Sequence, residues 1–378
     1  MAGIYIHIPF CKTKCIYCDF YSVTDLSGLS PFTKRLLEEL RERRDELPEG
    51  ERIETVYLGG GTPSLLDTRD LAAILETVRD TYPFAPGEPE ITIECNPGDV
   101  PALKARELVS LGINRVSIGA QSFNPRALRF LTRRHSPDDT REMAARFREA
   151  GISNLTLDLI YGIPGTTLEE LREDLRELTA LRPEHISAYS LMYEEGTPLY
   201  RGLLAHKVTE VDEDTALEMS RLVRNYLRDE GYERYEISNY KRSDTSRDFR
   251  SVHNSSYWEG KPYLGFGPGA HSYVHPVRSW HVPSLALYLA GTPRESETVT
   301  PEMAYEEYLL TRLRTARGIE LSQIKALLPS REEYEAFEER ALKMTEGEDP
   351  LLVRAEGGFL RLTDRGIDLS DAVLRNLV

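Results

Sequence analysis

Three of the four cysteines lie close together near the start of the chain, at Cys11, Cys15 and Cys18. One short loop with this spacing can place three thiolates on a single iron–sulfur cluster. A [4Fe–4S] cluster normally takes four thiolates, so a three-cysteine loop leaves one iron open to a chelating small molecule. The alternatives are a zinc site completed by His7 or Asp19, or reduced thiols without metal. Zinc is less favoured because its sites usually pair C-x-x-C ligands.

The elements around this loop follow a βα rhythm. From residue 4 to about residue 192, short β-rich segments alternate with amphipathic helical ones, which predicts about six βα units around a parallel sheet. We expect strands at Ile4–Ile8, Ile53–Leu58, Glu90–Cys95, Arg115–Ala120, Leu155–Ile160 and His185–Leu191. The helices between them are expected at Pro31–Leu47, Asp67–Tyr82, Pro101–Leu111, Pro137–Ala150 and Leu168–Leu181.

The expected strands each have one apolar and one polar face, because residues two apart point to the same side. In the first strand Ile4, Ile6 and Ile8 oppose Tyr5 and His7. The next polar faces carry Thr92, Glu94 and Asn96; Ser117, Gly119 and Gln121; and Thr156 and Asp158. Helices outside a parallel sheet pack on its apolar face, so the polar faces should converge on an interior ligand site. The strand His185–Leu191 does not separate clearly into two faces.

Several loops should meet at one edge of this sheet. The cysteine loop, the Gly59–Pro63 turn and Asn96–Gly98 all follow the carboxyl ends of strands. Ligands of parallel α/β folds bind at that edge, and a run of glycines lets backbone amides approach a ligand closely. The fourth cysteine, Cys95, lies on an apolar strand face, so we expect a buried, inert thiol.

The rhythm changes after about residue 200. We expect a helix at Asp212–Glu230, a strand near Tyr232–Ile237, and a long loop rich in glycine, proline and aromatic residues at Arg247–Trp280. From Thr300 onward, charged helices precede a hairpin of Leu351–Ala355 and Phe359–Leu362 and a closing helix, a pattern typical of a small winged-helix-like α+β domain. The expected division is 1–240, 241–298 and 299–378.

Composition excludes several classes of protein. The net charge is −15, with 47 Lys and Arg against 62 Asp and Glu, which argues against a nucleic-acid partner. No apolar run approaches the roughly 18 residues of a membrane span. The N-terminal residues lack an export signal, and clustered cysteines suit metal ligation better than disulfides, so we expect a cytoplasmic protein.

These motifs carry a family resemblance. Cys11-x-x-x-Cys15-x-Tyr17-Cys18 resembles the signature of the radical S-adenosylmethionine superfamily. The stretches Tyr5–Cys11, Tyr57–Pro63, Ser117–Ser122 and Asp158–Pro164 are similar, in order, to the oxygen-independent coproporphyrinogen oxidase-like group. The resemblance covers nearly the whole chain. It implies a partial (β/α)6 barrel in which S-adenosylmethionine, bound to the open iron, can accept an electron from a donor and form a 5′-deoxyadenosyl radical.

The resemblance also implies site residues. Those that would surround the first S-adenosylmethionine are Tyr5, Tyr17, Gly60, Gly61, Thr62 and Glu94. Those that would line a neighbouring site, for a second such molecule or a substrate, are Gln121, Arg133 and Asp158. Strand alternation independently places Tyr5, Glu94, Gln121 and Asp158 on inward faces.

Two branches of the group make different predictions. Coproporphyrinogen III dehydrogenases carry a further cysteine two residues after the third and an N-terminal extension; here Phe20 occupies that position and only a few residues precede the first strand. The HemW-type haem chaperones share the short N-terminus, a C-D-F run and the motif H-N-x-x-Y-W, which stands here at His253–Trp258. This branch implies a carrier that binds haem and passes it to a haem-accepting protein, which could be membrane-associated.

The same branch implies a haem site. His253 would be an axial ligand of the iron, and Tyr257 and Trp258 would offer flat apolar area to the porphyrin. If His253 were a plain loop residue, the next candidates would be His271, His275 and His281. A porphyrinogen decarboxylase, or a radical enzyme with another substrate, stays open as an alternative, and no catalytic residue is assigned.

Overall fold

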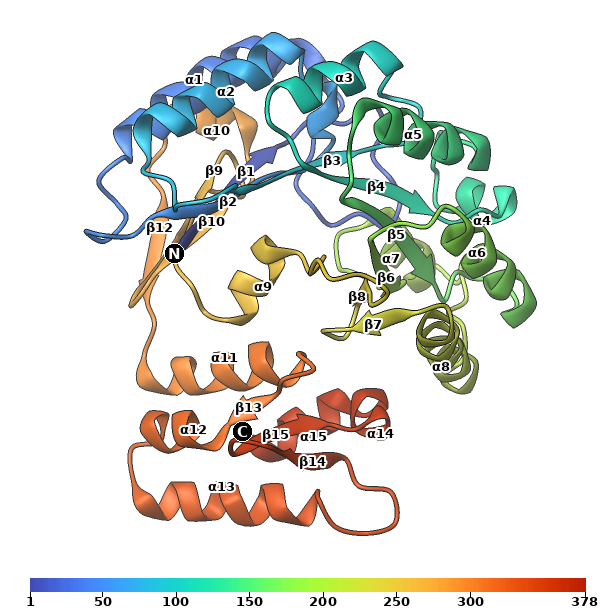
Figure 1. The fold of residues 1–378 in the computed structure, drawn as a ribbon, viewed down its shortest axis with the longest axis vertical. Helices are drawn as coiled ribbons and strands as arrows, with labels where there is room; N and C mark the ends of the chain where they lie inside the picture. The colour runs from blue at the N-terminus through green and yellow to red at the C-terminus, as the bar shows by residue number, and fades with distance from the viewer.

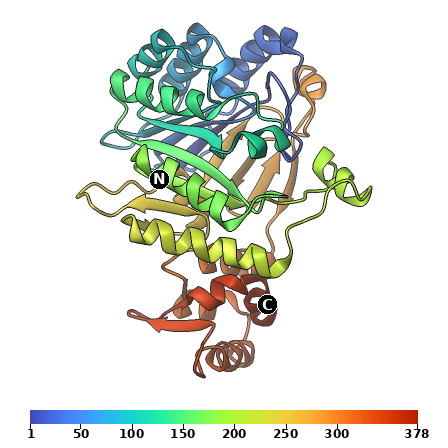
Figure 2. The ribbon, with the colours of Figure 1, turned by 90° about the vertical axis from the view of Figure 1, so that its right-hand side faces the viewer.

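The computed structural model describes residues 1–378, which form a large α/β unit and a small C-terminal domain beneath it (Figures 1 and 2). A twelve-stranded sheet runs through the large unit in the order β12-β11-β10-β9-β1-β2-β3-β4-β5-β6-β8-β7. Its six central strands are parallel, as expected from the sequence, and are β1 (Ala2–Ile8), β2 (Ile53–Gly60), β3 (Glu90–Cys95), β4 (Arg115–Gln121), β5 (Leu155–Tyr161) and β6 (His185–Ser190).

Helices cover the outer face of this sheet (Figure 1). They are α1 (Leu29–Glu42), α2 (Thr68–Thr81), α3 (Ala102–Ser110), α5 (Pro137–Ala150), α6 (Leu168–Ala180) and α8 (Glu213–Asp229), with the shorter α4 (Pro125–Phe130) beside them. The short α7 (Pro198–Leu204) lies against the cysteine loop, where the Leu199 amide donates to the carbonyl of Ile16. All of the expected βα helices are present. The first ends at Glu42 and not at Leu47, and Arg43, the next residue, turns into the protein to bind Glu39 and the carbonyl of Gly265.

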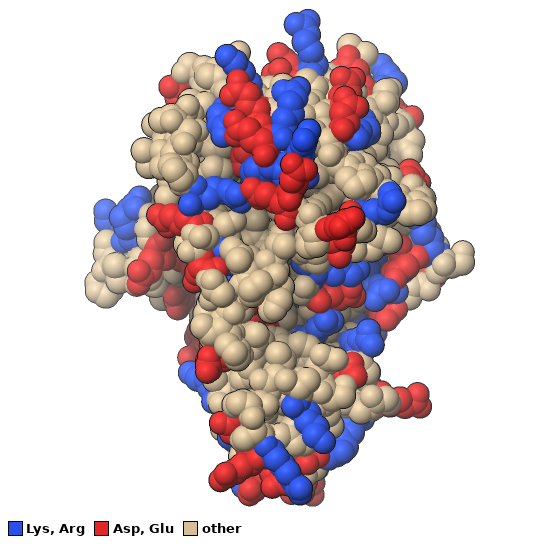
Figure 3. Space-filling model, turned by 90° about the vertical axis from the view of Figure 1, so that its left-hand side faces the viewer, with Lys and Arg blue, Asp and Glu red and all other residues tan.

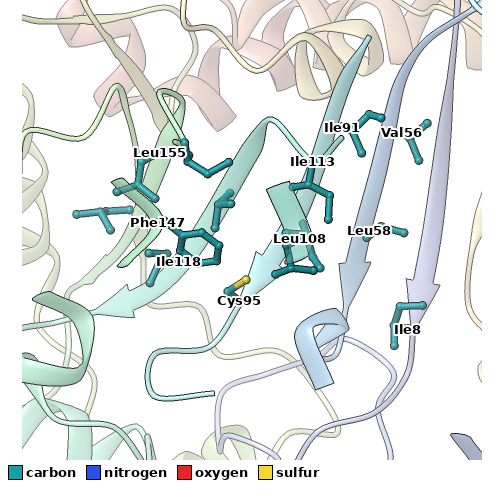
Figure 4. Packing of buried hydrophobic residues seen from close by; sticks show 14 of the residues in the cluster. Ile8, Val56, Leu58, Ile91, Cys95, Leu108, Ile113, Ile118, Phe147 and Leu155 are labelled. Carbon is teal, nitrogen blue, oxygen red and sulfur yellow. The ribbon is translucent and has the colours of Figure 1, made fainter. Parts of the chain in front are cut away.

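The apolar strand faces point outward, toward the helices, as the alternation predicts. Ile8, Leu58 and Ile118 are fully buried in one continuous core with residues of the outer helices, such as Phe147 (Figure 4). Cys95 lies in the same core with only 4% of its surface exposed. Packing the apolar faces outward leaves the polar faces to line the inside of the curved sheet.

The segment after α8 corrects two expectations. The strand expected near Tyr232–Ile237 is a hairpin of β7 (Tyr232–Arg234) and β8 (Asn239–Arg242). The long loop expected at Arg247–Trp280 is instead α9 (Val252–Trp258), β9 (Tyr263–Phe266), β10 (His271–Val274) and β11 (Val277–Trp280), continued by α10 (Leu285–Leu289) and β12 (Glu295–Thr298).

Strand β9 pairs in parallel with β1, so this segment extends the sheet. Short strands interrupted by glycines conceal the β pattern. At Gly265 a Cβ atom would lie only 2.0 Å from the carbonyl oxygen of His271, so the strand depends on glycine there.

The C-terminal domain is α+β, as expected. It contains α11 (Pro301–Leu313), α12 (Leu321–Leu327), α13 (Arg331–Lys343), α14 (Asp364–Asp368), α15 (Ser370–Leu377) and an antiparallel sheet ordered β13 (Ile319–Glu320), β15 (Phe359–Leu362), β14 (Leu352–Ala355). It has its own hydrophobic core. Arg224 binds Asp368 at 2.5 Å across the boundary between the two units, and α11 packs against α9. None of the helices is both long and apolar enough to cross a lipid bilayer.

Candidate functional site

A first cavity of about 580 Å³ opens at the carboxyl ends of the parallel strands. It is lined by the cysteine loop and by almost every residue that the sequence placed on the inside of the sheet. Those lining residues include Cys11, Cys15, Tyr17, Cys18, Gly60, Gly61, Thr62, Glu94, Gln121, Arg133 and Asp158. Tyr5 lines a second, adjoining cavity. The convergence expected from strand alternation is therefore present.

The cysteine loop is held to the end of β2 by backbone hydrogen bonds. The amide of Gly61 donates to the carbonyl of Ile8, and the amide of Thr62 donates to the carbonyl of Phe10, each at 2.8 Å. The Thr62 hydroxyl lies 3.6 Å from the Cys11 sulfur. These contacts fix the start of the loop beside the glycine turn.

Two of the glycines are required by this close approach. Gly60 has a φ of +104°, and a Cβ atom there would lie 2.6 Å from the ring of His7. At Gly61 a Cβ atom would lie 2.7 Å from the carbonyl oxygen of Phe10. Real Cβ contacts are longer, so only glycine allows the turn and the cysteine loop to pack together.

Arg133 forms the opposite side of the cysteine loop. Its guanidinium donates to the Cys15 sulfur at 3.5 Å, to Asn96 Oδ1 at 2.5 Å and to the carbonyl of Gly119 at 2.7 Å. Its Nε is buried without a partner. A fixed positive charge beside the thiols, with one buried donor still free, suits an anionic metal–thiolate centre with a polar ligand next to it.

The alternative of a single zinc ion finds no support in this geometry. No group of three or more His, Cys, Asp and Glu side chains lies close enough together to hold one metal ion. A cubane requires less convergence, because each thiolate binds a different iron atom. Cys11, Cys15 and Cys18 all line the first cavity, where three thiolates can each bind a different iron atom.

Two inward carboxyl groups have raised pKa values. Burial raises the pKa of Glu94 to about 7, with the nearby Asp158 adding to it, although the Tyr57 hydroxyl donates to Glu94 at 2.8 Å and the Gly60 amide at 3.1 Å. Burial also raises the pKa of Asp158 to about 6, against the opposing hydrogen bonds of Ser187 and Ser117. Both carboxyl groups can therefore take up or release a proton near neutral pH when a ligand enters.

The second cavity, of about 1280 Å³, adjoins the first and reaches the C-terminal domain. Phe20, Tyr57 and Glu94 line both cavities, and Tyr308 and Arg312 of α11 border the second. Phe20, which occupies the position of the further cysteine in the dehydrogenases, is 65% exposed. On the face drawn in Figure 3, charges of both signs mix over the outer helices, and an uncharged stretch runs down the middle.

His253 lies in helix α9 on the wall of the second cavity, not in a loop as expected. Its Nδ1 shares a hydrogen bond of 2.7 Å with the Thr55 hydroxyl, and its Nε2 shares one of 2.8 Å with the Tyr257 hydroxyl. Its ring stacks on Tyr57 at 5.0 Å, and burial lowers its pKa to about 3. The imidazole is therefore neutral at pH 7, but the Tyr257 hydroxyl must move before Nε2 can bind iron.

The other two residues of that motif also line the second cavity. The ring of Tyr257 packs edge-on against Tyr263 with centroids 4.5 Å apart. The indole of Trp258 lies 3.9 Å from the guanidinium of Arg314, and its Nε1 is buried without a partner. The structure thus brings His253, Tyr257 and Trp258 to one wall.

Sequence reasoning missed some lining residues. His185, Ser187 and Tyr189 of β6 line the first cavity, whereas Ile186 and Ala188 lie in the core. Their i, i+2 spacing contained this signal, but the strand begins and ends with residues that fit either face. Asn96 was expected near the cavity, but its contact with Arg133 depends on tertiary structure.

Comparison with known proteins agrees with this architecture. Residues 5–178 match the model of the Radical SAM superfamily. A Mycobacterium tuberculosis protein named heme chaperone HemW is 35% identical, over 100% of this chain and 94% of the relative. A mouse protein, radical S-adenosyl methionine domain-containing protein 1, mitochondrial, is 33% identical over 86% of this chain and 71% of the relative.

A solved structure shares the whole fold. It is the coproporphyrinogen III oxidase HemN of Escherichia coli, with a TM-score of 0.80 and 20% identity over 100% of this chain and 89% of that one. At this identity the likeness concerns the fold alone. The full-length similarity to the Mycobacterium protein is decisive for the family, and the superfamily match over residues 5–178 agrees with it. This chain belongs to the HemW family of radical S-adenosylmethionine proteins.

Proposed function

We propose that this chain is a haem chaperone, which binds haem and transfers it to an acceptor protein. The observation that carries the proposal is its 35% identity, over its full length, to a protein named heme chaperone HemW. The second cavity supports it, because a volume of about 1280 Å³ with aromatic walls can accommodate a large flat ligand.

The proposal includes a cofactor site in the first cavity. Cys11, Cys15 and Cys18 hold a [4Fe–4S] cluster, and S-adenosylmethionine occupies the open iron. The residues around S-adenosylmethionine are Tyr17, Gly60, Gly61, Thr62 and Glu94 of the first cavity and Tyr5 of the adjoining second cavity, with Gln121, Arg133 and Asp158 at the neighbouring site. The cluster supplies an electron, received from a donor protein, for the chemistry of S-adenosylmethionine.

Each of these side chains has a physical task in the proposal. Arg133, which already contacts Cys15, offsets the negative charge of the thiolates. The Glu94 carboxyl, fixed by Tyr57 and the Gly60 amide, faces the cavity and gains stability as a carboxylate when a cationic group approaches it. The glycine turn admits the ligand close to the backbone.

The haem site of the proposal lies in the second cavity, with His253, Tyr257 and Trp258 on its wall. Ligation by His253 requires Tyr257 to swing away from Nε2, after which the neutral imidazole offers its lone pair. Phe20 at the junction of the two cavities adds apolar area where a fourth cysteine would add a thiolate. This substitution favours a carrier over a porphyrinogen decarboxylase.

The test is a haem titration of the full chain after anaerobic reconstitution with iron and sulfide. We expect a saturable Soret band, and its replacement by the Soret band of the acceptor when an apo-haem protein such as apomyoglobin is added. His206→Asn is the control for binding outside the cavities and should bind haem as the unmodified chain does. His206 is exposed, lies outside both cavities, and has a φ of +53° that asparagine tolerates. No saturable haem binding by the unmodified chain would overturn the proposal.

A further inference from the structure

Five histidines line the second cavity, and all of them except His271 use at least one ring nitrogen in a hydrogen bond. His7 is bound at Nδ1 by the Tyr5 hydroxyl and at Nε2 by the carbonyl of Tyr21. His253 is bound at both nitrogens, as described above. His281 Nε2 contacts the buried Glu39 carboxylate at 2.9 Å. His7 and His253 cannot bind a metal without breaking internal hydrogen bonds, and the His281 side chain is buried, with only 7% of its surface exposed.

His271 differs from these three. It is exposed to the cavity, and its only side-chain contact of note is a stacked arrangement on Trp280, with centroids 5.6 Å apart and ring planes 19° from parallel. The two residues are a cross-strand pair of β10 and β11. Trp280 is fixed in turn, because its Nε1 donates to Glu295 at 2.9 Å. The imidazole is therefore held in position while its nitrogens stay free.

The remaining histidine, His275, has weaker support. Its Nδ1 shares a 3.2 Å hydrogen bond with the Tyr273 hydroxyl, and it lies beyond the end of β10, exposed and without a stacked ring. A ligand on an ordered strand positions a metal better than one on a connecting turn. His275 is thus the natural comparison for His271.

The surroundings of His271 suit a porphyrin. Tyr273 lies two residues further along β10, on the same face, and pairs with Tyr263 of β9. These rings continue, through the Tyr263–Tyr257 contact, to the wall that carries His253. Burial and the nearby Arg278 lower the pKa of His271, so its imidazole is neutral at pH 7, as ligation requires.

We propose that His271, supported by Trp280, is a haem-iron ligand of the second cavity, able to take haem in the conformation described here. The inference rests on the proposed haem-carrier function and names a second ligand for it. An imidazole donates its lone pair in the plane of its ring, so stacking on Trp280 leaves the lone pair available to iron. His253 becomes a competing ligand only after Tyr257 moves, which gives the carrier two imidazoles between which haem can pass.

The test is a titration of the full chain with ferric haem, followed by absorbance and electron paramagnetic resonance. His271→Ala should weaken binding by at least about tenfold, because even outer-shell partners of a metal contribute about 10–100-fold. Free imidazole should restore the original spectrum in this variant. His271→Met should keep haem bound and change the spectrum to that of a sulfur ligand, which a merely structural residue would not do. His275→Ala should leave affinity and spectrum unchanged.

Three outcomes are distinguishable. If haem affinity and spectrum are unchanged in both His271 variants and haem binding is lost in His253→Ala, this inference is overturned and the proposed function is retained. Loss of haem binding in His275→Ala alone would assign iron ligation to His275 and would also overturn this inference. No binding by the unmodified chain would overturn both. Iron and sulfide contents equal to those of the unmodified chain confirm that each variant keeps its fold and cluster.

Discussion

The raised pKa of Glu94 leads to a quantitative prediction. The carboxyl group lies at the inner wall of both cavities, and burial raises its pKa from 4.5 to about 7. A pKa difference of one corresponds to about 1.36 kcal/mol, so ionised Glu94 lowers the stability of the ligand-free chain by about 3 kcal/mol. The penalty is absent at a pH below the pKa that Glu94 has in the unfolded chain. It is complete once the pH exceeds the pKa of Glu94 in the folded chain. Stability is therefore lost as the pH rises through about 7.

Glu94→Gln should remove this pH dependence. The glutamine oxygen can still accept from Tyr57, but its NH2 group meets the amide of Gly60, and that cost does not change with pH. The difference in unfolding free energy between the variant and the parent should therefore shift in favour of the variant, by about 2.5 kcal/mol between about pH 5 and pH 8. Only the change with pH is diagnostic, because the fixed cost of the substitution cancels.

Urea unfolding of the ligand-free chain is a suitable assay. The only two tryptophans, Trp258 and Trp280, belong to the large unit, so their fluorescence reports on the part of the protein that contains Glu94. Glu76→Gln, an exposed substitution on α2, is the control and should show no such pH dependence. A difference between Glu94→Gln and the parent that stays constant within about 0.5 kcal/mol, the size of ordinary surface effects, would refute the reasoning.

Three further outcomes are expected. Alanine at Cys11, Cys15 or Cys18 should abolish the reconstituted [4Fe–4S] absorbance. Cys95→Ala should retain this absorbance, because the Cys95 thiol lies in the core. Stoichiometric zinc without sulfide in the purified protein would contradict the assignment. The chain should not decarboxylate coproporphyrinogen III with S-adenosylmethionine under reducing conditions, and Phe20→Cys alone should not change this; multiple turnovers would support the dehydrogenase alternative. Glu39→Ala should destabilise the large unit by about 3–5 kcal/mol in urea, because it removes the buried carboxylate that pairs with Arg43 Nη1 and accepts from Tyr288, and leaves Arg43 with Glu46 as its only carboxylate partner. A loss under about 1 kcal/mol would show that this ion pair is unimportant.

Glu39 also illustrates how a distant contact sets local electrostatics. Burial alone would raise its pKa, but hydrogen bonds from His281 and Tyr288 and the charge of Arg43 outweigh burial and hold the pKa at about 2. The Gly267 amide donates to the same carboxylate. One helical glutamate thus fastens α1 to α10 and to the residues that follow β9 and β11. Nothing in the spacing of α1 indicates this role.

The sequence by itself determined the parts of this protein that depend on local periodicity. The succession of β-rich and amphipathic helical segments predicted the six parallel strands, and alternation of apolar and polar residues within the strands predicted that Glu94 and Asp158 face inward while Cys95 faces outward. The three-cysteine spacing predicts a cluster loop, which stays a prediction, and the structure shows that all three cysteines line one cavity. The helix–hairpin pattern after Thr300 likewise predicted the C-terminal α+β domain. Such features rest on residues a few positions apart, whose geometry the backbone fixes.

Tertiary structure decided what depends on residues far apart in the chain. The segment Arg247–Trp280 forms a helix and three strands because β9 finds the free edge of β1, a partner about 260 residues earlier that no local pattern reveals. The same pairing places β10 and β11 beside the second cavity, and so selects His271 as the free imidazole. His253, prominent in the sequence, is bound at both nitrogens because Thr55 and Tyr257 meet it only in the folded chain. Which histidine is available to a ligand is a property of packing, because hydrogen bonding and burial of an imidazole depend on all the elements that surround it.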